Sequence, residues 1–182
     1  MNIYLATRNT GKLMAAQSAF DGTGITLLPV TREYPEIQAD TSAEIAHFTA
    51  LAVARDYHAP AIREDHSLYV NALGIPGPYM NFFNRKVSVA VLLALLSQFK
   101  DRSGYFEIAA AYAEPDGATK EFTFQVPCTF ATEERGTLQK GWDRIIILEG
   151  ESRTLAEYPE AERLNVWNKN FLAIRKMIEE GR

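Results

Sequence analysis

Three acidic side chains are candidates for a metal-dependent reaction. Glu64 and Asp65 are adjacent in REDHSLYVNAL, and Glu36 lies earlier, in YPEIQAD. Magnesium binds a small number of carboxylates together with water and phosphate oxygens, so two or three acids from separate loops suffice for a site that holds a phosphate chain. Acidic loops are also common on protein surfaces, and the sequence leaves that interpretation open. We interpret His66, beside the pair, as structural or exposed rather than as a ligand.

The segment Thr7-Arg8-Asn9-Thr10-Gly11-Lys12 is a candidate anion site. It is predicted to join a strand to the start of a helix, where free backbone N–H groups and the positive end of the helix dipole attract anions. Lys12 adds a full positive charge. The segment lacks the spacing of a Walker loop, so a solvated connector is the alternative interpretation.

A third candidate is GTLQKGWD, residues 136–143, where a glycine-bounded loop presents an aromatic ring beside an acid. Trp142 is suited to stacking on a base, and Asp143 is suited to accepting hydrogen bonds from ring N–H or amino groups. An isolated tryptophan often packs in a core or at its rim, and this alternative also stays open.

These residues must be positioned by a strand, loop and helix at the N-terminus and by further alternating elements. Residues 2–7 read as a buried strand, 8–11 as a polar turn and 12–20 as the opening of a helix. Capping candidates at 40–42 start a second helix that ends near His58. Its apolar side is expected to hold Ile45, Phe48, Ala52 and Val53.

The rest of the chain is expected to alternate in the same way. Residues 64–73 read as a strand, 85–99 as an apolar helix, and 104–113 and 120–131 as a hairpin. A loop at 136–141, a strand at 144–148 and a terminal helix at 160–180 follow. The apolar residues of that helix are Leu164, Phe171, Ile174 and Ile178.

Composition narrows the class of protein. The chain has 182 residues, 47% hydrophobic, and a formal charge of -4, which fits one domain over 1–182 or two closely joined lobes without a basic surface for nucleic acid. Cys128, the single cysteine, is expected to be a packed thiol in a reducing compartment. The start MNIYLAT lacks a signal-peptide pattern, and the longest apolar run, 87–96, is well short of the roughly 20 residues that span a bilayer. We therefore expect a cytoplasmic protein that does not bind membranes.

Taken together, these segments resemble the inosine triphosphate pyrophosphatase family almost from end to end. LATRNTGK is similar to the family's opening motif, and YPEIQADTSAEIA to its Pro-Glu-Ile-Gln segment before a helix. REDHSLYVNALGIPGPY resembles the acidic strand head and Pro-Gly-x-Tyr turn, GWD the aromatic-Asp loop, and RTLAEYPEAER the stretch before the last helix.

The resemblance implies an α/β fold: an elongated mixed β-sheet flanked by helices, in two lobes with a central nucleotide cleft, usually as a homodimer. It implies a hydrolase that cleaves non-canonical purine nucleoside triphosphates, such as ITP and XTP, into monophosphate and pyrophosphate. The cofactor implied is Mg²⁺, with Mn²⁺ as a substitute. The implied catalytic residues are Asp65, Glu64 and Lys12, and the implied metal ligands are Glu36 and Asp65. The implied substrate-binding residues are Thr7, Asn9, Lys12, Trp142, Asp143, Arg163, Asn168 and Lys169.

Several positions differ from the family pattern. An acid is replaced by Ala15, lysines are replaced near Thr49 and Asn81, and Trp167-Asn168-Lys169 stands where the family has Ser-His-Arg. Arg144 replaces a proline, and Arg85 and Lys86 are candidates for supplying the missing charge. The alternative is therefore a protein of the same fold that binds nucleotides without turning them over. The preferred base is left open, because Lys169 lacks the planar fork of arginine. The sequence also leaves the choice between ribose and deoxyribose open.

Overall fold

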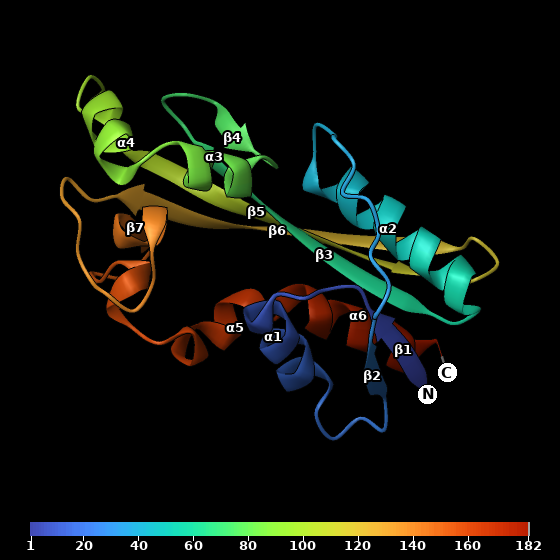
Figure 1. Cartoon of the computed structure of the whole chain (residues 1–182). Helices are drawn as coiled ribbons and strands as arrows, with labels where there is room; N and C mark the ends of the chain where they lie inside the picture. Colours follow the sequence, from blue (N-terminus) through green and yellow to red (C-terminus); the bar gives the residue numbers. More distant parts are fainter. Residues whose placement is uncertain (182) are drawn as a thin grey trace. The chain divides into compact units, whose positions relative to one another are not determined.

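A mixed β-sheet runs through the computed structural model, which describes residues 1–181 (Figure 1). The sheet has seven strands in the order β2-β1-β3-β5-β6-β7, with β4 paired to β3. β1 is parallel to β2 and β3, whereas the β3–β4 and β6–β7 pairs are antiparallel. The strands are β1 Asn2–Leu5, β2 Thr26–Pro29, β3 Ala61–Val70, β4 Ile75–Gly77, β5 Ser103–Ala113, β6 Thr119–Phe130 and β7 Ile146–Leu148. The predicted α/β class with a mixed sheet is confirmed.

The chain divides into two compact units, which are described separately. Unit 1 comprises Met1–Asp65, Ile108–Phe124 and the residues from Arg163 onward, and unit 2 comprises His66–Glu107 and Gln125–Glu162. The boundary between the units falls after Asp65, in the middle of β3, so the first half of this strand belongs to unit 1 and the second half to unit 2. Candidate residues from the sequence are thereby distributed over both units.

In unit 1 helices cover both faces of the sheet, because apolar side chains point to both sides of its strands. Ile3 and Leu5 of β1 pack in one apolar cluster with α1 (Thr10–Phe20) and α6 (Lys169–Glu180). Ala6 belongs to a second cluster with α2 (Ser42–Tyr57). Successive side chains of a strand point to opposite faces, which accounts for the two clusters. Figure 1 shows α1 and α6 together on one face and α2 on the other.

The ends of α2 agree with the sequence prediction. Thr41 is the N-cap and forms a capping box with Glu44, and His58 closes the helix in the left-handed conformation at φ 49°. The predicted apolar side is partly wrong, since Phe48 is 42% exposed. The buried side consists of Ser42, Ile45, Ala46, Thr49, Ala50, Val53 and Ala54. Its small residues let the helix lie close to the alanines of the sheet, so a large aromatic side chain is displaced outward.

Two predicted long helices are each interrupted. The predicted 85–99 helix is α3 (Met80–Lys86) followed by α4 (Val89–Leu96), because Ser88 accepts a hydrogen bond from the N–H of Val91 and starts a new helix. The predicted 160–180 helix is η3 (Glu160–Arg163), α5 (Leu164–Trp167) and α6, with the interruption at Asn168. Phe171 and Ile174 are fully buried, as the periodicity predicted.

The short strands β2 and β4 were missed, because neither contains enough residues to show an alternating pattern. The β5 and β6 strands of the predicted hairpin are confirmed within one residue. Two short 3-10 helices, η1 (Gly141–Arg144) and η2 (Leu155–Glu157), complete unit 2. Over residues 1–181 no helix combines the length and the apolar character that crossing a bilayer requires.

Candidate functional site

The Thr7–Lys12 loop joins β1 to α1, as predicted from the sequence. Asn9 is the N-cap of α1, and its Oδ1 accepts a hydrogen bond of 3.1 Å from the backbone N–H of Lys12. The backbone N–H of Asn9 donates to Thr7 Oγ1, also at 3.1 Å. Asn9 and Thr10 are exposed. The loop therefore presents the positive end of a helix of 11 residues to solvent from a fixed conformation.

Lys12 connects this loop to the acidic strand. Its Nζ donates a hydrogen bond of 2.9 Å to the backbone carbonyl of Glu64. The pKa of Lys12 is lowered, mainly because burial removes water from the ammonium group; the carboxylates of Glu64 and Asp65 oppose the shift, and Arg63 adds to it. The structure thus brings Lys12, Glu64 and Asp65 together in unit 1.

The two adjacent carboxylates are both buried, at 2% exposure for Glu64 and 8% for Asp65. Asp65 Oδ2 accepts a hydrogen bond of 2.6 Å from Ser42 Oγ, at the first residue of α2. A buried carboxylate is tolerated only when hydrogen bonds or cations compensate for lost hydration. Ser42 supplies such a bond and fixes one oxygen of Asp65.

Glu36 lies in the segment 30–41, which contains no helix or strand. Its side chain is 66% exposed and contacts Arg63, with Nη2 to Oε1 at 3.3 Å. The same guanidinium donates from Nη1 to the carbonyl of Ala6 at 2.9 Å, directly before the Thr7–Lys12 loop. Arg63 therefore connects the loop that carries Glu36 to the end of β1.

Other contacts hold the 30–41 segment against unit 1. Arg32 Nη1 and Tyr34 Oη both donate to Asp56 Oδ2, at 2.7 and 2.9 Å. Burial, followed by the hydrogen bond to Asp56, raises the pKa of Tyr34 to about 12, so its hydroxyl stays a donor at neutral pH. Arg8 and Glu33 form a further pair at 2.7 Å. These contacts restrict the positions that Glu36 can reach.

The donor set fits a magnesium ion that is shared with a phosphate chain. Within residues 1–181 there is no group of three or more His, Cys, Asp or Glu side chains arranged to hold a metal by protein ligands alone. Magnesium commonly uses one or two carboxylates and takes its remaining ligands from water and substrate phosphates. The exposed carboxylate of Glu36 and the hydrogen-bonded carboxylate of Asp65 are hard oxygen donors of the required kind.

Trp142 and Asp143 lie in unit 2, in η1. The side chain of Trp142 is 3% exposed, and its Nε1 donates to the carbonyl of Val87 at 2.9 Å. Its backbone N–H donates to Asn84 Oδ1 at 2.9 Å, and Gly141, at φ 62°, has no room for a Cβ beside Asn84. The ring is therefore packed and hydrogen-bonded in this structure, and its stacking on a base stays a prediction. Asp143 is half-buried beside it.

Arg163, Asn168 and Lys169 belong to unit 1 and surround the short helix α5. Arg163 and Asn168 are buried. Lys169 is exposed, and its Nζ lies 5.2 Å from the centre of the Phe124 ring. Arg163 directly precedes α5, which is one turn long, and Asn168 and Lys169 directly follow it.

The positions that differ from the family pattern include both buried and exposed residues. Ala15 and Thr49 are buried in helices α1 and α2, where they serve packing. Asn81 is exposed in the first turn of α3, and Arg85 and Lys86 are exposed in its last turn. At Ala15 and Thr49, residues packed in the core therefore stand where the family has charged side chains.

Two residues of the site were not recognised from the sequence. Ser42 was predicted only as one of the capping candidates at 40–42, and Arg63 was given no role. Both act through contacts with residues distant in the sequence: Ser42 with Asp65, and Arg63 with Ala6 and Glu36. No local pattern in a single sequence reports such contacts.

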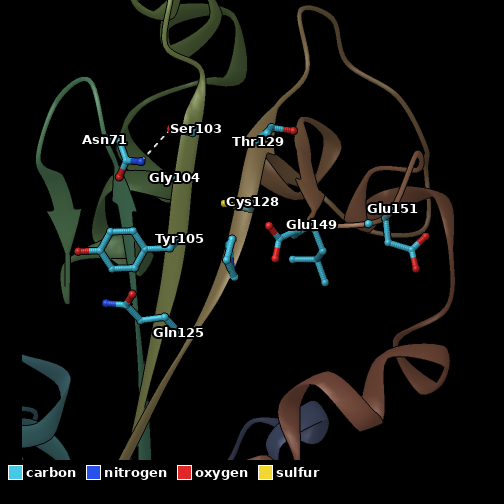
Figure 2. Close-up of a pocket in the computed structure, with 12 residues that line it drawn as sticks. Asn71, Ser103, Gly104, Tyr105, Gln125, Cys128, Thr129, Glu149 and Glu151 are labelled. Atoms are coloured by element: carbon cyan, nitrogen blue, oxygen red, sulfur yellow. Dashed lines mark hydrogen bonds between the residues drawn. The ribbon is translucent and has the colours of Figure 1, made fainter.

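A cavity of about 500 Å³ lies in unit 2, lined by β5, β6 and the segment after β7 (Figure 2). None of its lining residues is a predicted site residue. Tyr105 at its wall stacks on Tyr69 with ring centres 5.0 Å apart. Burial raises the pKa of Cys128, which also lines it, to about 12, so the thiol is not a nucleophile at neutral pH.

Comparison with known proteins identifies relatives along almost the whole chain. Residues 3–180 match the Ham1 family. A dITP/XTP pyrophosphatase of Thermococcus kodakarensis is 36% identical, covering 90% of this chain and 88% of the relative. One of Methanopyrus kandleri is 35% identical over 96% of this chain and 100% of the relative. A HAM1 protein of Coxiella burnetii has a similar structure, with a TM-score of 0.85 at 24% identity over 99% of both chains.

Proposed function

Because the chain belongs to the Ham1 family, we propose that it is a nucleoside triphosphate pyrophosphatase that hydrolyses non-canonical purine nucleotides such as dITP and XTP. The family resemblance inferred from the sequence is confirmed by these relatives. The structural observation that carries the proposal is the group formed by Lys12, Glu64 and Asp65 beside a helix N-terminus. Phosphoryl chemistry depends mainly on such positioning and charge neutralisation.

The Thr7–Lys12 loop would bind the phosphate chain. The N-terminus of α1 offers backbone N–H groups, and the side chain of Asn9 is fixed at the helix start by its bond to the Lys12 N–H. Thr7 Oγ1 is held by the N–H of Asn9, so both side chains are positioned before substrate arrives. Preorganised donors of this kind stabilise developing negative charge without having to reorient.

Magnesium, or manganese in its place, would be held by Glu36 and Asp65. A divalent ion supplies charge neutralisation on the phosphates and lowers the pKa of a coordinated water. Ser42 keeps the Asp65 carboxylate in one orientation through the 2.6 Å bond to Oδ2. Glu36 would approach from the exposed segment that Asp56 and Arg63 restrain.

The reaction would be an in-line attack of water on the α-phosphorus. The new P–O bond forms as the bond from that phosphorus to the oxygen bridging to the β-phosphate breaks, and pyrophosphate leaves. The proton of the water passes to a carboxylate of the Glu64–Asp65 pair. Lys12, held on the Glu64 carbonyl, would place its ammonium group against the phosphate charge.

Base recognition in unit 1 would use Arg163, Asn168 and Lys169, and Asp143 of unit 2 stays a proposed substrate-binding residue. Asn168 can both donate and accept, whereas the exposed Lys169 presents a single cationic group without a planar fork. For Trp142 we propose a positioning role in place of base stacking, because its indole is buried and bonded to Val87. A homodimer, implied by the family resemblance, and a cytoplasmic location, expected from the sequence itself, are part of the proposal, and a monomer by light scattering would remove the first.

The test is product analysis over a panel of triphosphates. Wild-type protein with Mg²⁺ is expected to release pyrophosphate, and not orthophosphate, from ITP, XTP or dITP faster than from the standard nucleotides. Preference for another nucleotide would keep the reaction but change the proposed base specificity. Tight binding of all of them without turnover would favour the non-catalytic alternative and contradict the proposal.

A further inference from the structure

Arg63 is a cation beside the acidic residues of unit 1, and the family resemblance assigns it no function. It lies on β3 directly before Glu64, and its side chain is mostly covered, with 21% exposed. Nη1 is fixed on the carbonyl of Ala6 at 2.9 Å. The guanidinium is therefore held where β1 ends and the Thr7–Lys12 loop begins.

The contact of Arg63 with Glu36 is the kind that a phosphate can replace. The distance from Nη2 to Oε1 is 3.3 Å, which is long for a charge-assisted hydrogen bond, and Glu36 is largely exposed. A carboxylate and a phosphate present similar acceptor oxygens to a guanidinium, which binds both in the same planar geometry. Exposed pairs of this type are weak, because water and salt compete with them.

Arg63 also retains unused donor capacity. Its Nε is buried and donates no hydrogen bond to any residue of the described chain. A guanidinium has five N–H groups, and the contacts to Ala6 and Glu36 account for only part of them. A buried donor without an acceptor is costly, so an anionic ligand that supplies one gains an additional interaction.

Lys12, the neighbouring cation, differs from Arg63 in its hydrogen bonding and in the permanence of its charge. Its ammonium group is bonded to the Glu64 carbonyl, and burial lowers its pKa. Arginine keeps its charge in any protein environment, so Arg63 is the permanent positive charge of the group.

We propose that Arg63 binds the phosphate chain of the substrate: anchored on the Ala6 carbonyl, its guanidinium exchanges the Glu36 carboxylate for phosphate oxygens. This inference rests on the proposed function, which it extends by naming a phosphate-binding residue and its resting partner. In the absence of substrate, Glu36 occupies Arg63. Phosphate binding frees the Glu36 carboxylate for its role as a metal ligand.

The experiment measures binding of inorganic tripolyphosphate by calorimetry in buffer with EDTA, so that neither metal nor turnover enters. Arg63→Gln is expected to weaken binding by about tenfold or more, since it removes charge-assisted hydrogen bonds. Arg63→Lys should fall between wild type and Arg63→Gln. The matched control is Arg175→Gln, because Arg175 also bonds one carbonyl, that of Ala19, and one carboxylate, that of Glu179. It should change affinity by less than about twofold.

Glu36→Gln separates phosphate binding from a structural role. Removing the competing carboxylate should strengthen tripolyphosphate binding, and this gain should shrink or vanish in the Glu36→Gln, Arg63→Gln double variant. Equal affinity of wild type and Arg63→Gln, or a full gain in the double variant, would overturn the inference. Pyrophosphate release by the same wild-type preparation distinguishes that result from a failure of the proposed function, which would abolish turnover whatever Arg63 does.

Discussion

Replacing Ser42 with alanine tests how the buried carboxylate of Asp65 is positioned. Thr41, not Ser42, is the N-cap of α2, and its capping box with Glu44 does not involve the Ser42 side chain. Alanine is also a good helix former, so the helix itself should persist. The main loss is the 2.6 Å hydrogen bond from Oγ to Asp65 Oδ2.

The size of the effect follows from the charge on the acceptor. A hydrogen bond to a charged group contributes roughly 1.5 to 3 kcal/mol, and a loss of that size in the transition state lowers the rate by roughly 10- to 150-fold. Because Asp65 is proposed to hold the metal, the concentration of Mg²⁺ that gives half-maximal rate should rise as well. KM for the nucleotide should change less than kcat, since the phosphate loop is untouched.

The assay is pyrophosphate release from XTP over a range of Mg²⁺ concentrations, with thermal unfolding measured in parallel. Ser88→Ala is the matched control, because Ser88 also lies at a helix start but caps α4 in unit 2. Activity of Ser42→Ala within about twofold of wild type at every Mg²⁺ concentration would refute the reasoning, because it corresponds to less than about 0.5 kcal/mol.

Three further predictions concern stability and reactivity. Phe171→Ala should lower the free energy of unfolding by about 3 to 5 kcal/mol, measured by urea denaturation, because Phe171 is fully buried in the core of unit 1; a loss below about 1 kcal/mol would contradict that placement. The folded-state pKa of Lys12 is lowered below its ordinary value of 10.5, so its charged form destabilises the native state at neutral pH, and this penalty should disappear as pH rises toward 10.5. This penalty is measured as the difference in unfolding free energy between wild type and Lys12→Met, compared at pH 7 and at pH 10. The same difference at both pH values would contradict the prediction. Cys128 should react with a thiol reagent only on unfolding, because folding raises the pKa of its thiol from 9.0 to about 12. For the same reason, raising the pH above 9.0 should destabilise the native state. Rapid labelling of the native protein would show that the thiol is accessible and would contradict the prediction.

Local features of the fold could be predicted from the sequence. The capping candidates at 40–42 identified the start of α2, and the alternation of β5 and β6 on either side of a turn identified the hairpin. Such signals depend on residues a few positions apart. The break at Ser88 was hidden because a single polar residue in an apolar run is compatible with a continuous helix.

The sequence identified the acidic residues and the Thr7–Lys12 loop as candidates, but it did not identify the residues that hold them in place. Ser42 and Asp65 are 23 positions apart, and Arg63 and Ala6 are 57 apart, so only the packing of α2 and β1 beside β3 brings them together. For Trp142, the local sequence indicated a stacking role but gave no sign of burial. Its neighbours in GWD do not reveal that Trp142 donates hydrogen bonds to Asn84 and Val87, and burial decides whether a ring is free to stack.

The central claim is that the carboxylates beside Lys12 catalyse pyrophosphate release. Asp65→Asn tests it most directly, because asparagine keeps the shape of the side chain but removes the charge that metal binding and proton transfer require. Asp116→Asn, in the exposed turn after β5 where Asp116 accepts from the Ala118 N–H, is the control. We expect Asp65→Asn to lose pyrophosphate release from XTP by several orders of magnitude, with Tm near that of wild type and with Asp116→Asn fully active. Turnover by Asp65→Asn at the wild-type rate would contradict the account.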